Sequence, residues 1–111
     1  MTIKQIYDMA IELGKASDLR GQKAVQEQLA RTKKQYEKLS KSEKDTFDTE
    51  QLLNPYADTR VVFGDPSTKV SKVMAGIDID AAELLIAKTL SKEKPIDAVI
   101  SHHPSGQGLA R

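Results

Sequence analysis

Two adjacent histidines near the end of the sequence are the residues whose type and spacing indicate chemistry. His102 and His103 are the only histidines among the 111 residues, and they follow the apolar run Ile96-Asp97-Ala98-Val99-Ile100 and Ser101. Neutral imidazole is the commonest metal ligand in proteins. Because neighbouring residues of a strand point to opposite faces, the pair can share a site only if the strand has ended. Pro104, which cannot donate to a sheet ladder, leads us to expect that end before the histidines.

Carboxylates at the end of an earlier predicted strand are the nearest further candidates. In parallel sheets, ligands bind beyond the carboxyl ends of the strands, so Asp78 converges with His102 and His103 if the two strands are neighbours. The competing interpretation is that a strand-end aspartate bonds the backbone and that the two histidines are ordinary surface groups. Asp80 is explained as a helix cap, and we assign it no ligand role.

Vicinal imidazoles at the mouth of a sheet suit metal chemistry. In one arrangement each histidine serves a different ion of a close pair, about 3.5–4 Å apart, that activates a bridging water for hydrolysis. The sequence has no cysteine, so any metal must use nitrogen and oxygen ligands, and thiol catalysis is excluded. Such ligands suit divalent zinc, iron, manganese and nickel equally, so the sequence leaves the metal cofactor open. No residue is assigned a catalytic role.

Residues 1–53 have helical spacing. We expect a first helix over about residues 3–13 that stops at Gly14, a second over about residues 22–39, and a short third from Ser40 to about residue 50 or 53. Asn54-Pro55 then ends helical structure, because the residue before a proline avoids the α-helical conformation. This helical segment precedes the part of the chain that carries the histidines.

Residues 54–111 change to an α/β pattern, within one domain or fragment that spans residues 1–111. We expect strands over residues 59–63, 70–79 and 96–100. A helix with the capping-box pattern at Asp80 separates the last two, and its predicted buried residues are Leu84, Leu85, Ala87 and Leu90. Strand, helix and strand form a βαβ unit with parallel strands. The predicted fold class is therefore α/β, with a helical N-terminal segment and a mostly parallel or mixed sheet.

Composition limits the class of protein and its partners. The chain is 39% hydrophobic and 30% charged, and no apolar stretch approaches the roughly 18 residues that cross a bilayer, so we expect a soluble cytoplasmic protein and no membrane partner. The net charge of +1 provides no global field for nucleic acid. Six basic residues between Arg31 and Lys44 are interpreted as a solvated helix face, with RNA binding as the alternative. The glycine-rich Ser105-Gly106-Gln107-Gly108 is predicted to be a turn.

Taken together, these motifs resemble the Nif-three-like proteins, the NGG-one-interacting-factor-three family. The family hallmark is a strand that runs into Ser-His-His-Pro, which matches Ser101 to Pro104 after the strand and helix that begin at Val73. A longer branch of the family has a helical N-terminal extension followed by Asn-Pro-Tyr-x-Asp-Thr-Arg and Gly-Asp-Pro, which match Asn54 to Arg60 and Gly64 to Pro66. The resemblance covers most of the chain.

The resemblance implies an α/β fold with a dinuclear metal site in a ring-shaped homo-oligomer, and it makes His102 and His103 the first two ligands. It implies a metal-dependent hydrolase, with a GTP-cyclohydrolase-like activity among the suggestions. The alternative is a non-catalytic metal-binding module or a regulatory module with a protein partner. Family members supply an aspartate and a later histidine–glutamate pair as further ligands. We therefore expect this chain to be an N-terminal fragment or truncated member, inactive by itself.

Overall fold

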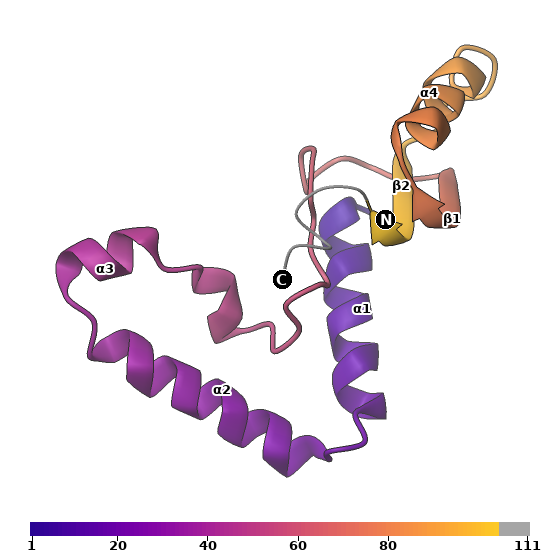
Figure 1. The fold of residues 1–111 in the computed structure, drawn as a ribbon. Coiled ribbons are helices and arrows are strands. Elements are labelled where there is room, and N and C mark those ends of the chain that lie inside the picture. The colour runs from indigo at the N-terminus through magenta and orange to yellow at the C-terminus, as the bar shows by residue number, and fades with distance from the viewer. Residues whose placement is uncertain (105–111) are drawn as a thin grey trace. The chain divides into compact units, whose positions relative to one another are not determined.

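The computed structural model describes residues 1–104, and the predicted turn at residues 105–108 lies outside them. The described chain has an α/β fold in which helices precede a small parallel sheet (Figure 1). Its elements in chain order are α1 (Ile3–Ser17), α2 (Gln22–Glu37), α3 (Lys41–Thr46), the 3₁₀ helix η1 (Thr49–Leu52), β1 (Val73–Ile79), α4 (Ala81–Leu90) and β2 (Ala98–Pro104). None of the helices within residues 1–104 combines the length and apolar character needed to cross a membrane.

The chain divides into two compact units. Residues 9–59 form the first, which we call the helical unit. Residues 1–8, together with the chain from residue 60 onward, form the second, which we call the sheet unit. Each unit has its own small core, with Ile11 and Val25 buried in the helical unit and Ile79 and Ala87 buried in the sheet unit.

Helix α1 continues past the glycine at which the sequence predicts its end. It runs through Gly14 to Ser17, so that prediction is wrong. The reason for a glycine at this position is packing, because a Cβ atom on Gly14 would come within 2.9 Å of the ring of Tyr56. The turn between α1 and α2 contains Gly21 instead. Its φ of 86° lies in the left-handed region that favours glycine, and α2 begins directly after it.

The predicted third helix is divided into two short pieces. Ser40 and Glu43 form a capping box at the start of α3, as the sequence indicates, but α3 ends at Thr46. The side chain of Asp48 then accepts a hydrogen bond from the backbone N–H of Glu50 and begins η1. A second local cap, eight residues after the first, therefore replaces one continuous helix with a short helix and a 3₁₀ turn.

A parallel βαβ unit forms the sheet unit, as predicted. Strands β1 and β2 are hydrogen-bonded neighbours, and their register runs from Val73 opposite Ala98 to Ile79 opposite Pro104. Helix α4 connects them and opens with the predicted capping box, in which the Asp80 carboxylate accepts from the N–H of Ala81 at 2.7 Å. This unit positions the carboxyl ends of both strands at one edge of the sheet.

Several predicted strand boundaries in the sheet unit are wrong, and β2 begins at Ala98 rather than at residue 96. β1 begins at Val73 rather than at residue 70, because the backbone N–H of Val70 donates to the carbonyl of Met1 instead of joining β2. Residues 59–63 form no strand. Phe63 is 95% exposed, and without a partner strand or a buried face the β-branched composition of this segment does not produce a strand.

The predicted burial of α4 is also largely wrong. Ala87 is buried as expected, whereas Leu84, Leu85 and Leu90 are 49%, 65% and 51% exposed. Two strands present too narrow a face to cover more than one stripe of a helix, and the described residues supply no further layer. The apolar side chains of α4 that the sequence pattern predicts to be buried are therefore mostly exposed to solvent among the described residues.

Candidate metal site

Both histidines lie within β2 rather than after it. The strand extends to Pro104, so the prediction that it ends before the pair is wrong. In the parallel register His103 lies opposite Asp78, and Pro104 lies opposite Ile79 at the end of both strands. A proline is tolerated at such an end because the ladder does not continue beyond it. The observed strand thus extends four residues beyond its predicted end at residue 100.

The two imidazole rings nevertheless lie together. Their centroids are 4.4 Å apart, and the rings meet edge to face with an interplanar angle of 79°. Alternation along a regular strand separates adjacent side chains, yet the two rings meet although both residues lie within β2, before its last residue Pro104. The sequence thus brings two nitrogen-bearing rings into contact without a loop.

A carboxylate from the neighbouring strand reaches the same place. Oδ1 of Asp78 lies 3.0 Å from Nδ1 of His103, as expected if the ends of the two strands converge. The side chains are 83% and 50% exposed, so the interaction lies in the solvent at the edge of the sheet. A contact between side chains that exposed adds little to stability.

The other polar side chains at this edge are engaged elsewhere. The hydroxyl of Ser101 donates to the carbonyl of Ile77 at 3.3 Å, so it does not contact either histidine as a nucleophile would. Asp80 caps α4, and its backbone N–H donates to Glu83 at 2.8 Å, which confirms the predicted structural role. The side chains left to act together are those of Asp78, His102 and His103.

These donors match a divalent metal in chemistry but are few in number. Imidazole nitrogen and carboxylate oxygen suit zinc, iron, manganese and nickel. Within residues 1–104, however, no cluster of three or more His, Asp and Glu side chains has the spacing of a metal site. Two imidazoles provide half of a four-ligand shell. The residues present therefore fit part of a metal site, and any other ligands would have to come from outside the described chain.

An aspartate at the opposite end of the strands aligns the two of them. Asp97 accepts hydrogen bonds from the backbone N–H groups of Ser71 and Lys72 at 2.9 and 3.0 Å, and from the Ser71 hydroxyl. These bonds, led by that from the Ser71 backbone, hold the pKa of Asp97 below its usual range. Asp97 and Lys72 are separated by the same 25 residues as His103 and Asp78. No role was predicted for Asp97 from the sequence, although its place one residue before β2 was a signal.

Comparison of the chain with family models, with curated proteins and with solved structures finds no match. The support for a function therefore comes from Asp78, His102 and His103 and from their geometry.

Proposed function

We propose that this chain is a Nif-three-like protein that binds divalent metal ions through His102 and His103, in the cytoplasm, and that its site belongs to a metal-dependent hydrolase. The observation that supports metal binding most directly is the contact of the two imidazole rings, whose centroids are 4.4 Å apart. They lie at the carboxyl end of a parallel strand pair, which is where ligands bind in such sheets.

The donor set defines what this chain contributes to such a site. A divalent ion held there would lower the pKa of a bound water and so supply a nucleophile for hydrolysis. The part of this chain is to present two nitrogen donors side by side and to orient one of them through Asp78. Because residues 1–104 provide two imidazoles where a closed site has four ligands, we expect weak metal binding and no turnover by this chain alone.

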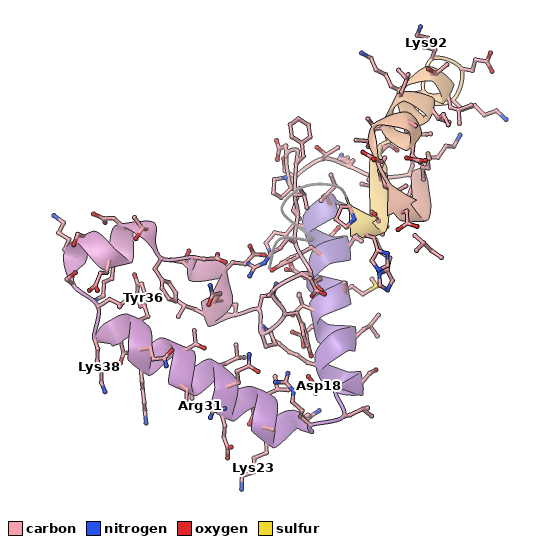
Figure 2. All side chains as sticks on the ribbon, viewed as in Figure 1. Asp18, Lys23, Arg31, Tyr36, Lys38 and Lys92 are labelled. Carbon is pink, nitrogen blue, oxygen red and sulfur yellow. The ribbon has the colours of Figure 1, made fainter. Side chains whose placement is uncertain are left out.

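Metal titration tests the proposal. The wild-type chain, His102→Ala, His103→Ala and the double variant are titrated with Zn²⁺, Mn²⁺, Fe²⁺ and Ni²⁺ by calorimetry. Lys92→Gln is the matched control, because Lys92 is exposed at the far end of α4 in the same unit (Figure 2). We expect each single variant to bind more weakly than wild type and the control to bind equally. Equal binding by wild type and the double variant would refute the metal site.

A non-catalytic role is the second candidate. It is favoured by the small donor set, because no group of three or more His, Asp or Glu side chains within residues 1–104 could hold a metal ion as a complete hydrolase site would. A hydrolase screen on the metal-loaded chain separates the two roles. Metal-dependent turnover that disappears in His103→Ala supports the hydrolase, whereas metal binding without turnover in the complete assembly supports the metal-binding or regulatory module.

Self-association is the partner that the sheet unit favours. Ile77 and Leu85 are 68% and 65% exposed, and apolar surface of this kind is covered by association in many soluble proteins. We therefore propose a homo-oligomer, in agreement with the family resemblance. Light scattering at several concentrations tests it, with Leu85→Gln expected to shift the equilibrium toward monomer and Lys92→Gln expected to leave it unchanged. A wild-type chain that stays monomeric throughout would contradict this part.

A further inference from the structure

The hydrogen bond between Asp78 and His103 has a consequence for the imidazole that goes beyond placement. Among residues 1–104, each of these side chains is the other's only side-chain hydrogen-bond partner, with 3.0 Å between Oδ1 and Nδ1. An ionised carboxylate has no proton to donate and can only accept. The hydrogen of this bond must therefore belong to Nδ1 of His103.

The neutral ring then has one defined arrangement of its two nitrogens. A neutral imidazole carries one N–H and one lone pair, so a proton on Nδ1 leaves the lone pair on Nε2. A histidine that donates Nδ1–H to a carboxylate is held in one tautomer and one orientation, and its ligating nitrogen becomes more basic. A histidine without such a partner favours the other tautomer in water.

The backbone provides the rigidity that this role requires. Asp78 and His103 are partners in the parallel register, so their separation is set by the ladder rather than by a flexible loop. Asp97 bonds the backbone of Ser71 and Lys72 at the opposite end of the same two strands. A slip of one residue would break that clasp, and it would also move Asp78 away from His103.

We propose that Asp78 is a positioning residue that holds His103 as the Nδ1–H tautomer and thereby leaves Nε2 to bind the metal. The part of this proposal that concerns metal binding by Nε2 rests on the function proposed above, whereas the tautomer of His103 can be measured without any metal. Asp78 acts through His103, and it is not itself assigned a bond to the ion.

The tautomer is read directly by ¹⁵N NMR of the histidine rings in the metal-free chain. The ¹⁵N shifts of the two ring nitrogens distinguish the Nδ1–H tautomer, the Nε2–H tautomer and the doubly protonated ring, so spectra at several pH values identify the neutral form. We expect His103 to show Nδ1–H in the wild type, to retain it in part in Asp78→Asn, whose amide oxygen can still accept, and to change to Nε2–H in Asp78→Ala. Glu93→Gln is the control, because it removes an equal charge from an exposed position of the same unit.

Metal affinity provides the second measurement. Removal of a carboxylate that orients a ligating histidine typically costs about 10–100-fold in affinity, so we expect a loss of this size for Asp78→Ala, a smaller loss for Asp78→Asn and none for Glu93→Gln. Circular dichroism checks that the variants remain folded. The Asn side chain retains a hydrogen-bond acceptor without the charge. If metal affinity falls from wild type to Asp78→Asn to Asp78→Ala in parallel with the Nδ1–H fraction of His103, Asp78 orients the ring and does not bind the metal directly.

The outcomes separate this inference from the proposed function. A wild-type His103 in the Nε2–H tautomer, or a tautomer unchanged in Asp78→Ala, overturns the role of Asp78 even if the chain binds metal. A wild-type Nδ1–H tautomer that changes in Asp78→Ala supports the role, even if titration finds no metal and the proposed function fails. Equal losses of affinity in Asp78→Asn and Asp78→Ala, with the tautomer intact in both, would indicate direct ligation and also overturn it.

Discussion

The helical unit and the sheet unit are each stabilised internally in a different way. In the helical unit, side-chain hydrogen bonds connect segments that are distant in the sequence. In the sheet unit, backbone pairing between β1 and β2 carries the connection, with side-chain bonds from Asp97 and Asp78 near its two ends. The helical unit therefore depends on the identity of a few polar side chains, whereas the sheet unit depends on its strand register, which leaves Asp78, His102 and His103 at the edge of the sheet.

An acidic side chain organises the helical unit at the turn between α1 and α2. Asp18, labelled at this turn in Figure 2, accepts from Nε and Nη2 of Arg20 at 3.0 and 2.8 Å and from the Tyr56 hydroxyl at 3.1 Å. Arg20 also donates to Gln28 of α2 at 2.6 Å. The turn is thereby connected to Tyr56, which lies 38 residues later in the chain.

The Asn-Pro-Tyr segment completes this network from the other side. Asn54 is 2% exposed, and its amide donates to the carbonyl of Thr59 while its oxygen accepts from the backbone of Tyr56, each at 2.8 Å. Gln28 donates to the carbonyl of Pro55 at 3.2 Å. The motif that resembles the longer Nif-three-like branch therefore has a structural role here, which is to join the loop to α2.

The largest effect is expected from the buried member of the network. Asn54→Ala leaves the Tyr56 N–H and the Thr59 carbonyl without these partners, and each buried unsatisfied group costs about 1–3 kcal/mol. We expect a loss of about 2–4 kcal/mol in the free energy of unfolding, measured by urea denaturation followed by circular dichroism. Gln35→Ala, at an exposed position of α2, is the control and should be nearly neutral. Similar values for both variants would contradict the importance of the network.

A pH effect should follow from Asp18. The two-pronged hydrogen bond from Arg20 holds the pKa of Asp18 well below its usual value of about 4. The folded state therefore binds fewer protons than the unfolded state, so the stabilisation is complete above about pH 4 and is lost as the pH falls toward the folded pKa. We expect Asp18→Asn to flatten the acid limb of the unfolding midpoint plotted against pH. Asp8→Asn, which removes the exposed ion pair of Asp8 with Lys4 on α1, is the control. Equal acid dependence of the unfolding midpoint in wild type and both variants would count against a stabilising role of ionised Asp18.

In the sheet unit, Asp97 is the closest counterpart of Asp18. Asp97→Ala removes the carboxylate that holds the two residues before β1, so the backbone amides of Ser71 and Lys72 lose their acceptor. We expect hydrogen exchange of these two amides to accelerate, because each loses a charged hydrogen-bond acceptor. Unchanged exchange there would show that the ladder alone holds the register, and the helical unit should be unaffected in either case.

The smallest effect is expected on the exposed side of α2. Lys23, Arg31 and Lys38 point to the same side of the helix, and Tyr36 lies on the other side, where it meets Phe47 at 5.1 Å (Figure 2). Replacement of Arg31 and Lys38 by Gln should change the unfolding free energy by less than about 0.5 kcal/mol, because neither side chain has a partner among residues 1–104.

The same pair of substitutions tests the RNA alternative. We expect only weak, salt-sensitive binding of RNA by the wild type, because Glu27 lies on the same stripe of α2 and the chain has a net charge of +1. Filter binding at two salt concentrations measures it, with Lys92→Gln as the control, because this variant removes one positive charge from an exposed position outside residues 31–44. Tight binding that the paired substitutions abolish would overturn the expectation.

Local patterns in the sequence predicted much of the fold. The capping boxes at Ser40 and Asp80 are both present, and the parallel strands with their connecting helix follow from the period-2 and period-3.6 patterns around Asp80. Two of the predictions failed because a segment distant in the sequence decided the outcome. Gly14 accommodates Tyr56 rather than ending α1, and residue 70 pairs with Met1 rather than extending β1.

The sequence by itself determined the chemistry of the candidate site, because residue identity alone restricts the donors to two imidazoles and the carboxylates near them. Only the tertiary structure decided how they meet. The parallel register places Asp78 opposite His103, and the rings of His102 and His103 meet although both residues lie within β2. The physical reason is that side-chain type is a local property, whereas register depends on hydrogen bonds between strands that lie 25 residues apart, which no local pattern specifies.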